Sequence, residues 1–392
     1  MSIGLLYERS ENDENGIKLT AQQLGFNLTF LPFRKIALSI SKDGFSAKTE
    51  GKDYTDTIRD IAVVLNRAQG KNRRLQASYV FEMLGKKTLN CSQIEFICFS
   101  KLRTLLHLWK EHIPIPKTAY VPCDSYDTMK NGSLIYNEED IADLFQAQIA
   151  LDKGIVIKAD AGTHGKMIML AQNQQELITN IKETKPSIIN PVGIVAQELI
   201  QKWFYDLRII VYKVKGKSPV CHPVAMARAG LTDFRTNTSL GNIVFDAKLP
   251  QHVQKLALKS GEALGRGHEA WLFGLDAMIN ASKNRDDEGI KTTLTKAAIE
   301  FQNVQKVKQD ETRLSDFKTW NAQLEKSVNK YMNTEPYAKV KDIIDQDVKV
   351  NQLGIVFHEA NSCPDFWEQT RLIAGINVAV PLLKGAQSLI DN

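Results

Sequence analysis

Two oxygen-bearing side chains stand two positions apart near the end of the chain, Glu359 and Asn361 in the segment HEANS. Residues two apart on a β-strand face the same side, so both would point together. Asp276, which ends FGLD, would add a second carboxylate from a neighbouring strand. Magnesium prefers such hard oxygen donors and completes its shell with phosphate and water. The pattern E-x-N is common by chance, so these residues gain weight only in combination with others.

Cationic side chains precede this group along the chain. Lys158 ends the apolar run GIVIK, and the glycine-bearing segment AGTHG follows at 161–165. A glycine turn exposes backbone N–H groups to phosphates, and a lysine supplies a point charge. Arg228 and Arg235 could hold a second anion through two-pronged contacts. A lone lysine or arginine is more often simply solvated, so the argument rests on the order: cations for phosphates, then oxygen donors for a metal.

Several other kinds of site are excluded. The sequence contains no GxxxxGK[ST], GxSxG or HExxH pattern, which argues against a P-loop, an α/β-hydrolase nucleophile and a zincin. The segment GRGHEA at 265–270 resembles a dinucleotide fingerprint, but it follows a predicted helix instead of a strand. The five cysteines are odd in number and form no CxxC pair. A cytoplasmic, reducing environment is therefore expected.

Composition sets further bounds. The net charge of +5 over 392 residues is weak, so it permits binding of polyanions without arguing for it. The first residues, MSIGLLYERSENDE, contain an apolar run too short for a signal peptide. No stretch approaches the ~18–20 apolar residues of a membrane helix. We expect a globular chain of two or three domains.

The remaining pattern predicts the elements that position these residues. Strands and helices alternate at 2–7, 17–24, 26–31, 61–66 and 75–84, which is typical of a small parallel α/β layer. A helix is expected at 100–112 with Ser100 as its N-cap. Later strands are expected at 154–160, 166–171, 195–200, 206–214, 271–279 and 354–360, and helices at 141–150, 174–183, 251–264 and 378–390. Residues 281–350 are polar and lysine-rich, and we interpret them as a helical insertion.

The order of these segments resembles the ATP-grasp superfamily, and within it the RimK-type ligases that add amino acids to carboxylates. FSKLRTLLHLWKEHIPIP is similar to the family's entry helix, and IVIKADAGTHGKMIML to its lysine strand and phosphate loop. IVAQELI resembles the adenine hinge, and DLRIIVYKVKG the strand that follows it. ARAGLTDFRTNTSLGN resembles an arginine-bearing segment, and FGLDAMI and HEANSCPDF resemble the metal-binding strands.

This resemblance implies an α/β fold of the ATP-grasp type in three parts. Residues 1–98 would form a small parallel N-terminal domain, 99–200 the small lid subdomain, and 201–392 the large subdomain. The insertion at about 281–350 would belong to the last of these.

The resemblance also implies a role for each matching position. The residues expected at the adenine, ribose and phosphates of ATP are Lys101, Lys158, Gly162, Thr163, His164, Gly165, Glu198, Leu199, Ile200, Asp206 and Arg208. Those expected to face the γ-phosphate and an acyl phosphate are Arg228, Arg235 and Asn237. Those expected to hold two magnesium ions, for which manganese can substitute, are Asp276, Glu359 and Asn361.

The implied reaction is an ATP-dependent, ADP-forming carboxylate–amine ligation. A carboxylate attacks the γ-phosphate to give an acyl phosphate, and an amine then displaces phosphate to form an amide. The implied partners are ATP, an amino acid such as glutamate or another amine, and a carboxylate on a protein, peptide or cofactor. Neither a membrane nor nucleic acid is expected, and homo-oligomer formation stays open. Candidates for the base that receives the amine proton are His164, His358 and Asp365.

Three departures from the family pattern concern the acceptor. The family's glycine pair reads Leu240-Gly241-Asn242, the phosphate loop carries His164 and Lys166, and the insertion is unusual. The insertion could recognise a macromolecular acceptor, or it could be an oligomerising or purely structural element. Two alternatives stay open: a ligase that joins two small molecules in the manner of glutathione synthase, and a non-catalytic ATP- or RNA-binding protein. The best support for RNA binding is the basic cluster 71–74, KNRR.

Overall fold

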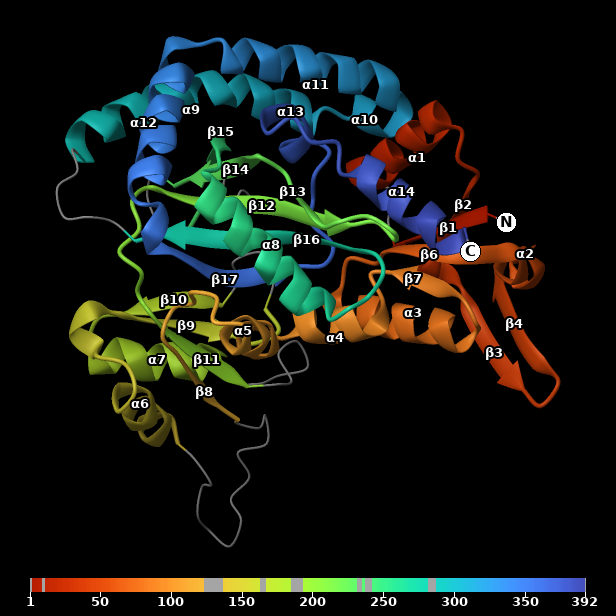
Figure 1. Ribbon diagram of the computed structural model, residues 1–392, viewed down its shortest axis with the longest axis horizontal. Helices are drawn as coiled ribbons and strands as arrows, with labels where there is room; N and C mark the ends of the chain where they lie inside the picture. The colour runs from red at the N-terminus through yellow and green to blue at the C-terminus, as the bar shows by residue number, and fades with distance from the viewer. Residues whose placement is uncertain are drawn as a thin grey trace, which may run out of the picture.

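The computed structural model describes residues 2–8, 11–122, 137–162, 167–184, 193–230, 235–236, 242–280 and 287–391. Three larger sheets organise these residues: a parallel N-terminal sheet, a small antiparallel sheet and a large antiparallel sheet (Figure 1). This mixed α/β architecture is the one predicted from the sequence. The domain boundaries at residues 98 and 200 stay a prediction.

The N-terminal sheet has the strand order β2-β1-β6-β7, and all its pairs are parallel. Its strands are β1 (Ser2–Tyr7), β2 (Leu28–Pro32), β6 (Ile61–Arg67) and β7 (Lys87–Leu89). The helices of this region are α1 (Asn12–Leu24), α2 (Thr55–Asp60), α3 (Lys71–Met83) and α4 (Ser92–Phe99). The C-terminal helix α14 (Ala379–Ile390) packs against α1 and β6, so the two ends of the chain share one core (Figure 1).

The N-terminal region differs from expectation in several elements. Helix α1 begins at Asn12 instead of residue 17, because a capping box between Glu11 and Glu14 starts it without an apolar residue. Helix α3 begins at Lys71 instead of residue 75, and helix α4 was not predicted. A hairpin of β3 (Ala37–Ser41), β4 (Gly44–Thr49) and β5 (Lys52–Asp53) was also missed. Every residue of β3 is exposed, so the strand lacks the alternation that sequence reasoning relies on.

The small antiparallel sheet has the order β10-β9-β11-β8. Its strands are β8 (Thr118–Val121), β9 (Ile155–Ala159), β10 (Ile168–Ala171) and β11 (Ile194–Glu198). Helices α6 (Glu138–Gln146) and α7 (Gln174–Thr184) pack on it and form a separate hydrophobic core with it. Helix α5 (Lys101–Lys110) precedes β8, and the Ser100 hydroxyl accepts a hydrogen bond from the Arg103 N–H, as predicted for an N-cap.

The large antiparallel sheet has the order β15-β14-β12-β16-β17, with β13 paired to β12. Its strands are β12 (Tyr205–Lys213), β13 (Val220–Cys221), β14 (Val224–Ala229), β15 (Ile243–Lys248), β16 (Trp271–Ile279) and β17 (Ile355–Asn361). Helix α8 (Gln251–Gly265) packs against β12 and β16. Gly261 and Gly265 are required there, because a Cβ at either would overlap the buried ring of Trp271.

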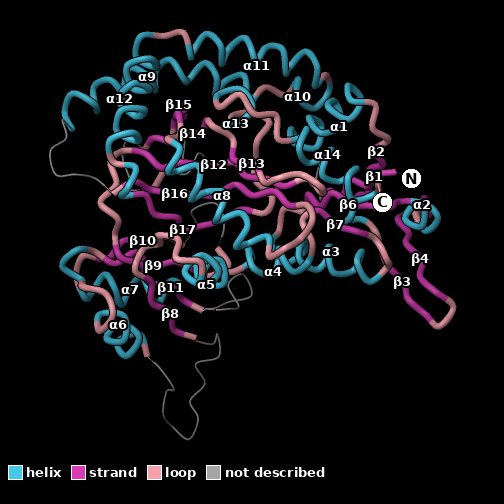
Figure 2. Tube along the Cα trace, in the orientation of Figure 1, coloured by secondary structure: helices cyan, strands magenta, loops and turns pink. Residues whose placement is uncertain are grey.

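The predicted insertion is helical. Its helices are α9 (Asp287–Gln309), α10 (Thr312–Ser315), α11 (Phe317–Met332) and α12 (Glu335–Val350). They lie along one side of the large sheet (Figure 1 and Figure 2), and their buried side chains join the sheet's own core. The hydroxyls of Tyr331 and Tyr337 donate to the Val244 carbonyl and the Asp246 carboxylate of β15. These helices are therefore a structural layer of the large sheet.

Shorter elements complete the chain: η1 (Phe33–Lys35), η2 (Leu151–Lys153), η4 (Gln352–Gly354) and α13 (Thr370–Ile373). Within the described ranges, no helix combines the length and the apolar character that crossing a membrane requires.

Candidate functional site

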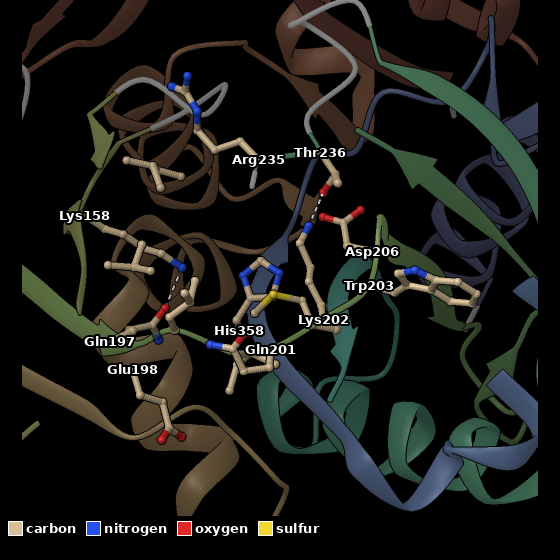
Figure 3. A pocket seen from close by; sticks show the side chains of 15 residues that line it. Lys158, Gln197, Glu198, Gln201, Lys202, Trp203, Asp206, Arg235, Thr236 and His358 are labelled. Atoms are coloured by element: carbon tan, nitrogen blue, oxygen red, sulfur yellow. Dashed lines mark hydrogen bonds between the residues drawn. The ribbon is translucent and has the colours of Figure 1, made fainter. Parts of the chain in front are cut away.

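A cavity lies between the small sheet and the large sheet (Figure 3). Its volume is about 210 Å³, several times the ~30 Å³ that one water molecule occupies in the liquid. One wall comes from β9, β10 and the segment around the end of β11, and the other from β12, β16 and β17. The lining residues are Val156, Lys158, Ile168, Gln197, Glu198, Leu199, Ile200, Gln201, Lys202, Trp203, Asp206, Arg235, Thr236, Met278 and His358.

The predicted hinge residues line this cavity, but not all through their side chains. Glu198 accepts a hydrogen bond at Oε1 from the Lys117 N–H at 2.8 Å, and Figure 3 shows its carboxylate turned away from His358. The Leu199 N–H donates to the Gly154 carbonyl, and the Ile200 carbonyl accepts from the Lys202 N–H. Leu199 and Ile200 lie just beyond β11, which ends at Glu198. A flat apolar ligand would meet Leu199, Val156 and Met278 here.

Lys158 projects from β9 into the cavity wall. Its Nζ donates to Gln197 Oε1 at 2.5 Å, and Gln197 donates in turn to the Thr118 hydroxyl at 3.1 Å. Burial, together with the positive charge of Lys101, lowers the pKa of Lys158 to about 8, although Glu359 acts in the opposite direction. Within the described ranges the Lys158 ammonium contacts a neutral amide and no carboxylate, so it is ready to receive an anion.

Lys101 begins helix α5 and reaches the segment that follows β9. Its Nζ donates to the Gly162 carbonyl at 2.8 Å and lies 3.7 Å from Glu359 Oε1. Asp160 fixes this approach, because its carbonyl and its carboxylate accept the N–H groups of Lys101 and Leu102. Two predicted phosphate residues, Lys101 and Gly162, are thus in contact.

Two arginine–carboxylate pairs cross the large sheet. Arg228 donates to both oxygens of Asp206 at 2.7 and 2.8 Å, and Arg208 donates to both oxygens of Asp276 at 2.9 Å. The strand register sets these pairs, since Asp206 faces Arg228 and Arg208 faces Asp276 in the ladder. Arg228 also lies 3.2 Å from Asp276, so it links the two carboxylates. Burial favours the neutral acids, but the arginines outweigh it and lower the pKa of both Asp206 and Asp276.

The three predicted metal ligands meet at the edge of this network. Asp276 of β16 is the ladder partner of Glu359 on β17, and Asn361 Nδ2 lies 3.4 Å from Asp276 Oδ2. Burial opposes ionisation of Glu359, but Lys101 and Lys71 lower its pKa to about 2. The described residues contain no cluster of three His, Cys, Asp or Glu side chains. Two ionised carboxylates and one amide oxygen nevertheless suit magnesium, which needs few protein carboxylates.

A β-bulge adds His358 to the cavity wall. The register of β16 and β17 shifts between Asp276 and Ala277, which face Glu359 and Phe357, so His358 has no ladder partner. Both ring nitrogens are shielded from solvent and have no hydrogen-bond partner among the described residues. Burial and then Lys158 lower the pKa of His358 to about 4, so the ring is uncharged at neutral pH.

Lys71 is a site residue that the sequence analysis missed. It opens helix α3, its side chain is 8% exposed, and its Nζ lies 3.6 Å from Glu359 Oε1. Arg74 of the same cluster is buried against Glu95, and Arg73 pairs with Glu8. The cluster 71–74 is therefore not an exposed basic patch, and the RNA-binding alternative loses its best support. Helical spacing places Lys71 and Arg74 on one face, a signal that could have been read from the sequence.

The structure brings most of the predicted residues together. Those that line the cavity are Lys158, Glu198, Leu199, Ile200, Asp206 and Arg235. Those that meet beside it through ion pairs or hydrogen bonds are Lys101, Gly162, Arg208, Arg228, Asp276, Glu359 and Asn361. Outside the described residues lie Thr163, His164, Gly165 and Asn237. Of the candidate bases, His358 is a cavity residue, and Asp365 is not among those that line the cavity.

The sequence is similar to those of known proteins. Residues 101–285 match the family of RimK-like ATP-grasp domains. The α-aminoadipate–LysW ligase LysX of Sulfurisphaera tokodaii is 26% identical over 277 residues, which cover 70% of this chain and 84% of LysX. A probable α-L-glutamate ligase of Pectobacterium carotovorum is 27% identical over 230 residues, 54% of this chain and 64% of that protein.

The fold has counterparts at lower sequence identity. D-alanyl-alanine synthetase A of Vibrio cholerae is 10% identical and aligns with 100% of this chain and 99% of its own, with a TM-score of 0.57. This likeness shows the fold of the whole chain, beyond the segment that the family matches. The chain therefore contains a RimK-like ATP-grasp domain at residues 101–285, and its overall fold is the ATP-grasp fold.

Proposed function

We propose that this protein adds an amino acid to a carboxylate carried by a protein, a peptide or a cofactor, with an acyl phosphate as the intermediate. One observation carries the proposal: the ionised carboxylates of Asp276 and Glu359 and the amide of Asn361 meet beside two buried lysines. The names of the relatives support the substrate class. One relative pairs α-aminoadipate with LysW, and another is called a probable glutamate ligase.

The nucleotide would occupy the cavity between the sheets. Its base would lie against Val156, Leu199 and Met278, with its phosphates directed toward Lys158 and Lys101. Lys158 suits this role because its ammonium is buried beside a neutral amide, and a phosphate would supply the missing negative charge. Lys101 would connect the phosphates to the Gly162 segment, whose carbonyl it already contacts.

The residues that would hold magnesium are Asp276, Glu359 and Asn361, and the bound metal would neutralise phosphate oxygens. Lys71 and Lys101 both lie within 3.7 Å of Glu359 Oε1. Arg208 and Arg228 fix Asp276 in place through three contacts. We propose two ions at this point, with manganese as a substitute. The fixed position of Asp276 suits a metal that demands regular geometry.

The proposed reaction requires the protein to position the carboxylate, the phosphate and the amine and to balance their charge. A carboxylate oxygen of the acceptor forms a bond to the γ-phosphorus, and the bond between that phosphorus and the β-bridging oxygen breaks, which releases ADP. The amine then attacks the acyl carbon, the bond from that carbon to the phosphate oxygen breaks, and the proton of the amine passes to the departing phosphate. Arg235, at the cavity rim, and Asn237 are the proposed contacts of the transferred phosphoryl group. Water must be kept out, because it would hydrolyse the acyl phosphate.

The N-terminal sheet would contribute to the acceptor side. Lys71 carries a charge from that sheet's helix α3 to the metal strand β17. Arg67 donates to the Pro364 carbonyl, and Arg74 donates to the Ser362 hydroxyl, so the loop after β17 is fixed to the same region. An acceptor carboxylate that approached Glu359 would therefore meet the Lys71 ammonium. A cytoplasmic setting belongs to this proposal.

The test combines the purified protein with MgATP, single amino acids and an extract of its host. The extract is divided into macromolecular and small-molecule fractions, and ADP release and mass shifts are measured. We expect ADP to appear with one amino acid and one fraction, together with the mass of the added residue on a protein, peptide or cofactor. Ligation of two free small molecules would favour the glutathione-synthase-like alternative. ATP binding without ADP in any mixture would contradict the proposed ligation.

A further inference from the structure

The hairpin formed by β3, β4 and β5 has an open edge at β3. Strand β4 pairs with β3 on one side and with β5 on the other, and no described strand pairs with the outer edge of β3. The hairpin projects from the N-terminal region, and its tip lies away from the rest of the described chain (Figures 1 and 2). Every residue of β3 is exposed. A strand in this position offers its backbone to another strand.

The contacts of Ala47 on β4 show which backbone groups of β3 face outward. The Ala47 N–H donates to the Thr55 hydroxyl, and the Ala47 carbonyl accepts from the Tyr54 N–H, so both groups point away from β3. Leu38 is the ladder partner of Ala47 and therefore belongs to a non-hydrogen-bonded pair. Because the direction of these bonds alternates along an antiparallel strand, the N–H and C=O groups of Leu38 and Ile40 face the open edge.

The sequence of β3 lacks the usual protection of a free edge. Exposed edges are commonly interrupted by a lysine, a proline or a bulge. Strand β3 reads ALSIS, without a charge or a proline, and its ladder with β4 continues without a bulge. Leu38 and Ile40 lie on the same face of the strand, and Ile40 is 82% exposed. These features favour a partner strand at this edge.

Strand β3 is complementary to a second copy of itself. In an antiparallel pairing centred on Ser39, Leu38 of each copy lies opposite Ile40 of the other. These are the residues whose backbone groups face the open edge, so each such pair exchanges two hydrogen bonds. The aliphatic side chains of each pair also meet on one face, which stabilises paired strands.

The same register matches charges at both ends of the strand. Lys35 precedes β3 and Asp43 lies in the turn that follows it, and the register sets each opposite the other residue of the second copy. Both side chains are exposed, and neither forms an ion pair with another described residue. Uncharged residues stand opposite the other two cations of this region: Ile36 opposite Lys42, and Gly44 opposite Arg34. The register therefore opposes no like charges.

We propose that two copies of this chain associate through β3, which pairs with itself about a two-fold axis at Ser39 and joins both hairpins into one sheet. Antiparallel pairing of two projecting hairpins places the two bodies at opposite ends of the paired strands, so the bodies do not obstruct it (Figure 1). Each copy uses its open β3 edge, so the pair closes at two copies. The contact is small, which gives a weak and reversible dimer. This inference is independent of the ligase reaction.

Sedimentation velocity of the full chain without nucleotide measures this association. We expect the wild type to pass from monomer to dimer with a Kd of about 1–100 μM. Ile40→Pro removes an outward N–H and leaves the bonds to β4, and it should weaken association more than about tenfold. Ile40→Ala should weaken it by about fivefold to thirtyfold. Ile299→Ala, which removes an exposed isoleucine from α9, should leave it unchanged.

A charge exchange tests the register. Lys35→Asp alone opposes two carboxylates at each end of the strand pair and should weaken association about fivefold at low salt. Adding Asp43→Lys restores opposite charges and should return the Kd to within about twofold of the wild-type value. Lys42→Asp changes the net charge by the same amount at a position opposite Ile36, so it should not weaken the dimer.

Other outcomes would overturn the proposal. A wild type that stays monomeric at about 200 μM would refute self-pairing and leave the edge to a strand of another protein. Dimers that both Ile40 variants leave intact would place the contact on another surface. Failure of the charge exchange to restore association would refute the register, and assemblies larger than two copies would refute the two-fold closure. If circular dichroism shows that Ile40→Pro does not fold, Ile40→Ala and the charge exchange decide, because they change exposed side chains only.

Discussion

The two walls of the cavity carry charge in different ways. On the large sheet, the charged residues of the site are paired: Asp206 with Arg228, and Asp276 with Arg208. On the small sheet, Lys158 is buried, and its one contact in the described part of the chain is the neutral side chain of Gln197. One wall is thus a fixed network of ion pairs, and the other presents a charge that contacts no counter-ion among the described residues. We therefore expect the large-sheet wall to contribute to stability as well as to chemistry, and the small-sheet wall to contribute mainly to ligand binding.

The substitution with the largest expected effect on this network of ion pairs is Arg228→Met. The change would leave Asp206 and Asp276 as buried carboxylates without their shared guanidinium, and breaking a buried pair costs ~3–5 kcal/mol. We expect a loss of this size in the free energy of unfolding, measured by denaturant titration. Arg59→Ala provides the matched control, because Arg59 pairs with Asp56 at the surface, where a pair contributes ~0–1 kcal/mol. Equal stability losses in the two variants would refute the contrast between the walls.

Glu359→Gln separates chemistry from stability on the same wall. The amide keeps the shape of the side chain but removes the negative charge that would hold a metal and balance Lys71 and Lys101. We expect turnover to fall by ~10²–10³-fold, the range for the loss of one electrostatic group in an active site. ADP release at saturating MgATP is the measurement, with the exposed Glu335→Gln as control. Turnover like that of the wild type would show that Glu359 holds no catalytic metal.

Much of this arrangement could be predicted from the sequence, and the parts that could not have physical reasons. The strands that carry Lys158, Asp276 and Glu359 were predicted because buried strands leave continuous apolar runs. The start of α1 at Asn12 was not predicted, because the helix begins with a polar capping box and not with the apolar residues on which the prediction relied. The roles of the site residues stay predictions, while their convergence is visible in the structure.

The pairing of charged side chains from different strands was the main feature that could not be predicted from the sequence. Nothing in the order of residues shows that Arg228 bridges Asp206 and Asp276, because the register of three strands decides it. The bulge that turns His358 into the cavity is likewise a property of the β16–β17 ladder. Lys71 reaches Glu359 only because the parallel sheet packs beside the large one. Charges read singly from the sequence look solvated, whereas the fold pairs Arg228 with Asp206 and Asp276 and buries Lys158 beside a neutral amide.

The small-sheet wall is tested by Lys158→Met. Removing the ammonium should weaken MgATP binding by roughly 10–100-fold, since a charged hydrogen bond contributes ~1.5–3 kcal/mol. The unfolding free energy should stay the same or rise, because a buried charge without a counter-ion is replaced by an apolar chain of similar length. Calorimetry and denaturant titration on one preparation provide both values. A variant that loses stability but keeps its ATP affinity would reverse the contrast between the walls.

The smallest expected effect is on the pH dependence of nucleotide binding. Burial lowers the pKa of Lys158 to about 8, so the free protein loses this charge as the pH rises through 8. ATP binds the protonated form, and its affinity should therefore fall above pH 8, by about tenfold per pH unit at most. Lys158→Arg keeps its charge throughout this range, so its ATP affinity should change less between pH 7.5 and 9. Lys71, whose pKa burial also lowers to about 8, is present in both proteins and cancels in the comparison. Parallel pH profiles would mean that the charge of Lys158 does not hold the phosphates, and the contrast between a paired and an unpaired wall would have no consequence for binding.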